Sequence, residues 1–284
     1  MNIKPRATSH ERRATKEAQN QSQSDDYAER GPIQFGPWTS ASFRSDPKRF
    51  VFQMSRYKFC AKMLTGKFRV LEVGCGDAPG VTIVLQTVGS VHGIDVEPIV
   101  IEDNLKRFAC SRHCEPACRL TGPDTDSKSG RSNPIPSEIA SVSKRKIPRN
   151  DKNSNSIRIS RVTFALHDLI KKPLTKKFDA VYSLDVIEHI PPTQEQKFMR
   201  HLCASLDPQA VCLMGTPNQT AQEHASIYSR QGHVNLKTAE TLRALLEKYF
   251  YNVFIFSMND EVIHTGFSPM AHYLFGMGVG VKKP

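Results

Sequence analysis

The sequence predicts an α/β fold built on an open, mostly parallel sheet. Short apolar runs of strand length alternate with apolar stretches of helical length over most of the chain. The first run, Phe68–Val73, ends at two glycines, Gly74 and Gly76, and a helical stretch follows from Val81. A strand, a glycine turn and a helix in this order form the ligand-binding edge of open α/β sheets. The rest of the predicted fold is organised around this turn.

The residues of the glycine turn restrict which ligand it can hold. The dinucleotide fingerprint G-x-G-x-x-G requires a third glycine where this chain has Pro79, and Gly80 comes one position late. Carboxylates at Glu72 and Asp77 would repel a pyrophosphate, whereas they would attract a ligand that carries an ammonium and a sulfonium. A tight turn without a ligand is the simpler alternative for any pair of glycines.

The turn resembles the first motif of the class I S-adenosylmethionine-dependent methyltransferases, E/D-x-G-x-G-x-G. Ala78 stands in place of the last glycine of that motif. The resemblance implies S-adenosyl-L-methionine as cofactor, with Glu72, Gly74, Cys75 and Gly76 among the residues that bind it. A dinucleotide oxidoreductase is the least favoured alternative.

Six further strands are expected in the order that this family requires. They cover Ser90–Asp95, Val162–Leu169, Phe178–Leu184, Ala210–Met214, Asn252–Ser257 and His272–Val281. Helices are expected from about Pro47, Val81 and Pro98, and over Gln194–Leu206 and Thr238–Tyr249. The implied fold is Rossmann-like, with a seven-stranded, mostly parallel sheet, helices on both faces and a C-terminal antiparallel hairpin.

Acidic residues follow the second and third expected strands. Asp95 stands about twenty positions after the glycines, where a carboxylate hydrogen-bonds ribose hydroxyls in nucleoside-binding α/β folds. Its alternative role is to cap the helix that begins near Pro98. The resemblance implies that Asp168 accepts a hydrogen bond from the adenine amino group. It further implies a cofactor-binding set of Val96, Asp168, Leu169, Ser183 and Leu184.

The segment 178–190 reads F-D-x-V-x-S-x-D-V-x-E-H-I, a pattern similar to the ubiquinone-biosynthesis-like methyltransferases of type 11/23. Methyl transfer from a sulfonium is an in-line displacement, for which the protein supplies alignment and, for a hydroxyl acceptor, a base. His189 and His233 are the candidate bases, because an imidazole titrates near neutral pH. His233 lies near the end of a polar loop, Asn218 to Asn235, that is expected to form the acceptor pocket. For His189 a packing role beside Glu188 is an equal alternative.

A metal-assisted variant uses some of the same residues. Asp185, Glu188 and His189 have the i, i+3, i+4 spacing of one helical face, and His233 would complete a mixed oxygen and nitrogen site. The set is similar to the metal ligands of small-RNA 3′-terminal 2′-O-methyltransferases and of ubiquinone O-methyltransferases. Asp185 is shorter than the glutamate of those families, so the favoured prediction contains no metal.

Composition divides the chain into a folded domain and two segments of low complexity. Residues 1–31 are predicted to be a disordered tail, and 32–284 the folded domain, interrupted by a basic, disordered insertion at 109–160. The segment from residue 106 to residue 161 contains thirteen basic and five acidic residues, so most of the net charge of +11 lies there. A basic loop explains this better than a nucleic-acid-binding face. Cys110, Cys114 and Cys118 give a zinc site as a less favoured alternative.

The seven cysteines are an odd number, scattered through expected core and loops, and predict reduced thiols in a cytoplasmic protein. No apolar run reaches the length of a membrane helix. The resulting hypothesis is a methyltransferase that modifies an oxygen or nitrogen of a small-molecule acceptor. The alternatives are a methyltransferase for RNA or protein, which would use the basic insertion, and a non-catalytic protein that binds the cofactor.

Overall fold

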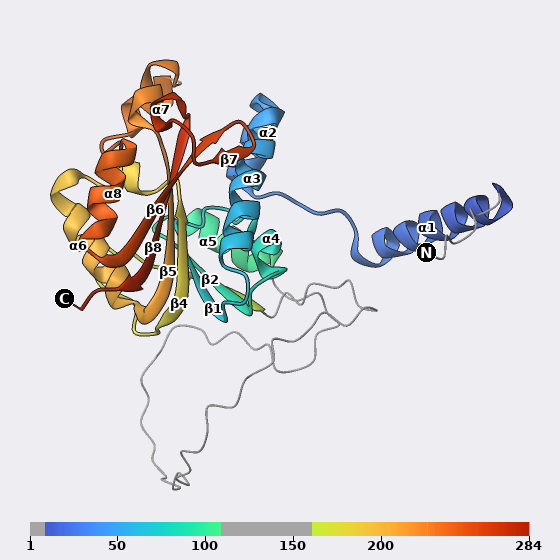
Figure 1. Cartoon of the computed structure of the whole chain (residues 1–284). Coiled ribbons are helices and arrows are strands. Elements are labelled where there is room, and N and C mark those ends of the chain that lie inside the picture. Colours follow the sequence, from blue (N-terminus) through green and yellow to red (C-terminus); the bar gives the residue numbers. More distant parts are fainter. Residues whose placement is uncertain (1–8, 109–160, 226, 284) are drawn as a thin grey trace, which may run out of the picture. The chain divides into compact units, whose positions relative to one another are not determined.

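The computed structural model describes residues 9–108, 161–225 and 227–283 (Figure 1). The chain divides into two compact units, Met1–Phe35 and Gly36–Pro284. The insertion expected at 109–160, with its three cysteines, lies outside the described residues. Its disorder and its zinc alternative therefore stay predictions.

The first unit contains a helix where the sequence predicts a disordered tail. Helix α1 covers Ser9–Arg30. It is rich in Ala, Gln, Glu and Arg, which have high helix propensities. The prediction relied on the shortage of apolar side chains, which argues against packing in a core but does not prevent a helix from forming.

The second unit is built on one eight-stranded sheet with the strand order β3-β2-β1-β4-β5-β8-β6-β7. The parallel strands are β1 (Arg69–Val73), β2 (Ser90–Asp95), β3 (Val162–Leu166), β4 (Phe178–Leu184) and β5 (Leu206–Pro217). The antiparallel strands are β6 (Phe250–Asn259), β7 (Val262–His264) and β8 (Tyr273–Val281). The predicted Rossmann-like α/β class and the antiparallel end of the sheet are confirmed. The eighth strand, β7, is the addition to the seven expected.

Helices cover both faces of this sheet (Figure 1). Helices α3 (Pro47–Met63) and α4 (Val81–Leu85) contribute to an apolar core on one face, and α6 (Pro192–Ala204) and α8 (Ala239–Glu247) to a core on the other. Helix α5 (Pro98–Arg107) packs beside β2 and β3, and α2 (Pro37–Ser45) precedes α3. The short helices are η2 (Ile187–His189), η3 (Gln219–His224), α7 (Ile227–Gly232) and η4 (Ser268–Met270). Among the described residues, no helix has both the length and the apolar character needed to cross a membrane.

The central strands are almost completely buried, which explains why their apolar runs identified them. In β1, Val70 and Leu71 are fully buried, and so are Ala180 and Val181 in β4. Strands covered by helices on both faces read as continuous apolar runs. The carboxyl ends of the parallel strands meet at one edge of the sheet, and the candidate site lies there.

Candidate active site

The glycine turn after β1 has the backbone that its sequence predicts. Gly74 has a φ of +70° and Gly76 a φ of +50°. A Cβ at Gly74 would lie 2.2 Å from Cγ2 of Val186, so any side chain there would collide. Ala78, which replaces the last glycine of the motif, also has a positive φ, of +49°. The position therefore has the left-handed backbone for which glycine is ordinarily used.

Asp95 at the end of β2 holds the glycine turn in place. Its Oδ2 accepts a hydrogen bond from the Gly76 backbone N–H at 2.8 Å, and its Oδ1 accepts one from the Glu97 N–H at 3.0 Å. The backbone N–H groups of Gly74 and Cys75 both donate to the Ile94 carbonyl, at 2.9 and 3.0 Å. Asp95 is 8% exposed, and it borders a cavity at this edge of the sheet.

Two adjoining cavities open at the carboxyl ends of the strands. The larger one, of about 620 Å³, is bordered by five of the predicted cofactor residues, which are Gly74, Asp95, Val96, Asp168 and Leu169. The smaller one, of about 320 Å³, is bordered by Gly74 again together with Cys75, Gly76 and Leu184. Trp38 and Asp185 border both cavities, as does Gly74. The structure thus brings eight of the ten predicted cofactor-binding residues to one continuous cleft.

The other two predicted cofactor residues, Glu72 and Ser183, border neither cavity. Both are buried, each 2% exposed. The Tyr57 hydroxyl donates to Oε1 of Glu72 at 2.9 Å. Burial raises the pKa of Glu72 to about 8, with a further contribution from Asp95, although the neighbouring Tyr182 and Tyr57 hydroxyls oppose the shift. Glu72 is therefore a buried, mostly protonated group that joins α3 to β1 beneath the turn.

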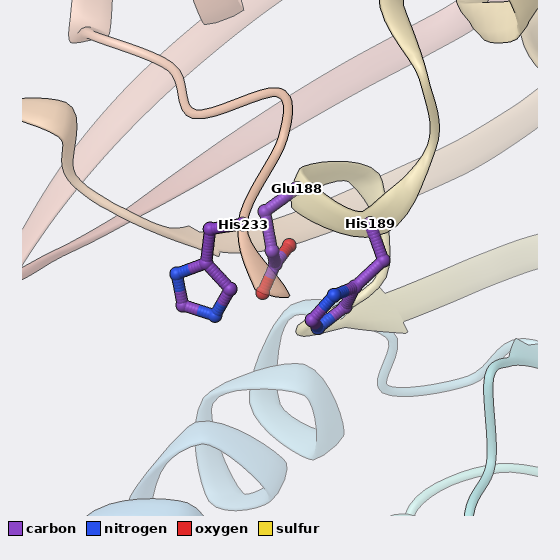
Figure 2. A group of neighbouring side chains, drawn as sticks. All are labelled: Glu188, His189 and His233. Carbon is purple, nitrogen blue, oxygen red and sulfur yellow. The ribbon is translucent and has the colours of Figure 1, made fainter. Parts of the chain in front are cut away.

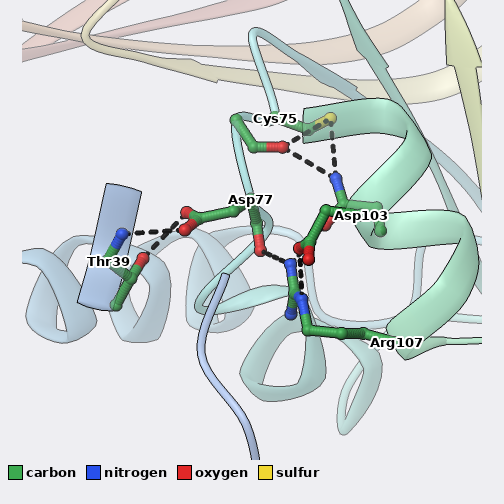
Figure 3. A network of polar contacts seen from close by, with 7 residues as sticks. Thr39, Cys75, Asp77, Asp103 and Arg107 are labelled. Atoms are coloured by element: carbon green, nitrogen blue, oxygen red, sulfur yellow. Dashed lines mark hydrogen bonds and ion pairs between the residues drawn. The ribbon is translucent and has the colours of Figure 1, made fainter. Parts of the chain in front are cut away.

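Asp77 uses its carboxylate to fasten α2 to the glycine turn (Figure 3). It accepts from the Thr39 backbone N–H at 2.7 Å and from the Thr39 hydroxyl at 2.8 Å. On its other side, Arg107 of α5 donates to the Asp77 carbonyl at 2.6 Å and pairs with Asp103 at 2.5 Å. The sequence offered no signal for the contacts of Asp77, whose partners Arg107 and Thr39 lie 30 and 38 positions away.

Helix α3 supplies side chains that sequence reasoning missed. Arg49, Gln53 and Arg56 border the smaller cavity. Arg56 donates to Oδ2 of Asp185 at 2.7 Å, and its guanidinium lies 3.8 Å from the centre of the Tyr273 ring. Asp185 has a positive φ of +57°, which is uncommon for a residue other than glycine.

Glu188, His189 and His233 form a compact group next to these cavities (Figure 2). One ligand atom from each lies within 4.8 Å of the others, and the two imidazole centres are 5.1 Å apart. Glu188 is fully buried; its Oε2 accepts from the Thr216 hydroxyl at 3.0 Å, and its Oε1 has no hydrogen-bond partner among the described residues. His189, which borders the larger cavity, shares a 3.0 Å hydrogen bond between its Nδ1 and the Gly232 carbonyl.

Burial sets the protonation of this group. It raises the pKa of Glu188 to about 8, and Asp185 adds to the shift. Burial also lowers the pKa of His233, with further lowering by His189 and Arg49, whereas Asp185 opposes it. The lowered pKa makes the neutral imidazole the main form of His233 at neutral pH. A carboxylate and two imidazoles also suit a divalent transition-metal ion. Of the four ligands considered from sequence, however, Asp185 pairs with Arg56 instead.

The comparisons with known proteins agree with this geometry. A family model described as a methyltransferase domain, of the type 23 family, matches residues 35–253. The chain belongs to the methyltransferase type 11/23 family. The methyltransferase is an enzyme, and its cofactor is S-adenosylmethionine.

Solved structures of low sequence identity share the fold of this methyltransferase. The methyltransferase domain of bacterial CtHen1 aligns with a TM-score of 0.56 and 17% identity, covering 81% of this chain and 99% of that one. DhpI, in complex with S-adenosylhomocysteine, aligns with a TM-score of 0.52 and 10% identity, covering 86% of this chain and 92% of that one. SibL in its apo form aligns with a TM-score of 0.50 and 14% identity, covering 86% of this chain and 57% of that one. No curated protein matches the sequence.

Proposed function

We propose that this methyltransferase methylates an oxygen or nitrogen of a small-molecule acceptor bound in the cleft at the carboxyl ends of β1 and β4. The observation that carries the proposal is the pair of adjoining cavities, which share Trp38, Gly74 and Asp185. Their volumes, about 620 and 320 Å³, lie in the range of small-molecule sites. One cleft can therefore hold the cofactor and a small acceptor side by side.

The residues of the larger cavity suit an adenosyl group. Gly74 lets the backbone approach a ligand closely, because it carries no Cβ. Asp95 and Asp168 offer carboxylate oxygens to ribose hydroxyls and to an amino group, and Leu169 offers an apolar contact to a flat ring. When bound, the cofactor supplies an electrophilic methyl group on its sulfonium. The protein has to align the acceptor with that methyl group and exclude water.

His233 and His189 are the candidate groups that accept the acceptor's proton. A base must be unprotonated at the working pH, and the lowered pKa of His233 meets this condition. The Gly232 carbonyl fixes the ring of His189 by its contact with Nδ1. The bond to that carbonyl places the proton on Nδ1 and leaves Nε2 as the free acceptor.

A second candidate acceptor is the ribose hydroxyl of an RNA, and two observations favour it. The Glu188, His189 and His233 group could hold a divalent cation beside the acceptor. Helices α2 and α3 are also basic, since residues 37–63 contain one acidic residue and six basic ones. These are Arg44, Lys48, Arg49, Arg56, Lys58 and Lys62. Exposed basic side chains attract phosphates, although Arg56 already pairs with Asp185.

Methyl labelling of a cell extract separates the two candidates. The protein is incubated with methyl-labelled S-adenosylmethionine and an extract divided into small molecules, RNA and protein. We expect the label in the small-molecule fraction, with transfer almost independent of salt. Label in the RNA fraction, lost steeply as salt rises and dependent on added Mn²⁺, would replace the small-molecule proposal with the second candidate.

A further inference from the structure

A buried ion pair lies close to His233 and outside both cavities. Oε2 of Glu195, in the first turn of α6, pairs with Nζ of Lys237 and accepts from the Asn235 side-chain amide at 2.8 Å. Lys237 also donates to Oδ1 of Asn235 at 2.8 Å. The Lys237 and Glu195 side chains are only 10% and 16% exposed. The three residues, called the Glu195 clamp below, tie the end of the long loop after β5 to α6.

Between this clamp and His233 the backbone is fixed residue by residue. The N–H groups of Val234 and Asn235 both donate to the Glu188 carbonyl, at 2.8 and 3.0 Å. On the other side of His233, the Gly232 carbonyl contacts Nδ1 of His189 at 3.0 Å. His233 is therefore held between two attachments to the segment that carries Glu188 and His189. The Glu195 clamp then attaches Asn235 and Lys237, which follow in the chain, to α6.

Stability alone does not account for such a clamp. Burying two charges costs several kcal/mol in lost hydration, and apolar residues of similar size often stabilise a fold as well or better. The clamp does, however, restrict geometry, because the Asn235 amide contacts both charged groups at once. Its charges are also absent from the causes of the shifted pKa of His233, which are burial, His189, Asp185 and Arg49. Any effect of the clamp on His233 would therefore act through position.

We propose that Glu195, Asn235 and Lys237 are positioning residues that hold the His233 imidazole against Glu188 and His189. The proposal rests on the proposed role of His233 for its importance to catalysis, but not for its geometry. Misplacement of a reacting group by about 1 Å can lower a rate about 10²-fold, so a loop that carries such a group needs rigid support. Here the support comes from α6, an element packed in the apolar core through Phe198, Met199 and Leu202.

The test measures the distance between the two imidazoles, and it needs no acceptor. In protein with labelled histidine rings, we expect a nuclear Overhauser effect between ring protons of His189 and His233, whose centres are 5.1 Å apart. Lys237→Met should abolish it and speed hydrogen exchange of the Val234 and Asn235 amides about 10-fold or more. The exchanged pair, Glu195→Lys with Lys237→Glu, should restore both signals, because the Asn235 amide can turn over to serve the reversed charges.

Two further variants keep the test decisive. If Lys237→Met does not fold because a buried carboxylate is left unpaired, Glu195→Gln with Lys237→Met is measured instead, and the same loss is expected. Leu245→Ala, in the core contact of α8, is the control for general destabilisation and should keep the ring contact. A ring contact that survives in Lys237→Met and in Glu195→Gln with Lys237→Met, or that disappears equally in Leu245→Ala, would overturn the proposal. Full methyl transfer by His233→Ala would instead refute the proposed base and leave this measurement unaffected.

Discussion

At the scale of single residues, Asp95 supports the glycine turn and borders the larger cavity. Two roles are predicted for it, a ribose ligand and a helix cap. Its carboxylate accepts hydrogen bonds from the Gly76 and Glu97 N–H groups while the residue borders the larger cavity. A carboxylate oxygen can accept more than one hydrogen bond. Asp95 can therefore hold the turn and still bind a ribose hydroxyl.

Replacing Asp95 by alanine should weaken cofactor binding. Loss of a charge-assisted hydrogen bond costs about 1.5–3 kcal/mol, so the dissociation constant for S-adenosylhomocysteine should rise roughly 10- to 150-fold. Isothermal titration calorimetry measures this directly. Asp207→Ala, at a partly exposed ion pair with Arg69, is the matched control and should bind as the wild type does. Equal affinity in both variants would remove Asp95 from the binding site.

His233 carries the sharpest residue-scale prediction about chemistry. His233→Ala should lower kcat about 10²–10⁴-fold if the imidazole is a base, and leave the affinity for S-adenosylhomocysteine unchanged. Because the pKa of His233 is lowered from its usual 6.5, the pH at which wild-type activity falls to half of its plateau should lie below 6.5. Rates measured on the acceptor between pH 5 and 8 test the profile. Loss of cofactor binding in the variant would show that His233 has a structural role instead.

At the scale of elements, α2 depends on a cap from outside its own sequence. Its N-cap residue, Gly36, has no side chain that could bond the free N–H groups of the first turn. Asp77, on the glycine turn, accepts from the Thr39 N–H instead. The helix that carries Trp38 is thus attached directly to the turn that Trp38 covers, since the Trp38 ring would lie 3.3 Å from a Cβ at Gly76.

Asp77→Ala should therefore loosen α2 and weaken cofactor binding together. It leaves buried donors without a partner, which costs about 1–3 kcal/mol of unfolding free energy. Trp38 is the only tryptophan in the chain, so its fluorescence reports on α2 alone. Acrylamide should quench it more strongly in Asp77→Ala, and added S-adenosylhomocysteine should protect it less than in wild type. Asp77→Asn keeps one acceptor oxygen, so its quenching should be intermediate between that of the wild type and that of Asp77→Ala. Unchanged quenching in Asp77→Ala would contradict the coupling.

At the scale of the whole molecule, the sequence predicted what local patterns can encode. The short strands β1, β2 and β4 each carry buried apolar residues that mark them in the sequence, and the residues at their ends were identified with them. Contacts between distant segments left no such pattern. Arg56 meets Asp185 across 129 positions, which removed Asp185 from the metal group considered from sequence. Likewise, burial of Glu72 beneath the turn follows from the packing of α3, and no motif encodes it.

Two buried glutamates give the fold a distinctive dependence on pH. The pKa values of Glu72 and Glu188 are raised from 4.5 to about 8, mainly by burial. An acid whose pKa is raised on folding binds more protons in the folded state, so stability falls as pH rises across this window. The contribution of each is fully present below pH 4.5 and is lost by about pH 8. Most proteins gain stability over part of this range, because their carboxylates have lowered pKa values.

Glu72→Gln should therefore flatten the pH dependence of the whole fold. Glutamine keeps an acceptor for the Tyr57 hydroxyl and cannot ionise, so the variant should lose none of its burial and none of its pH 5 stability. The melting temperature of the wild type should fall from pH 5 to pH 8, and the fall should be clearly smaller in Glu72→Gln. Glu223→Gln, at an exposed position, serves as the control and should follow the wild type. Parallel melting curves for all three proteins would contradict the prediction, because they would show that Glu72 is ionised in the folded state throughout this pH range. A buried charge at Glu72 would then need a neighbouring cation, and among the described residues none contributes to its pKa.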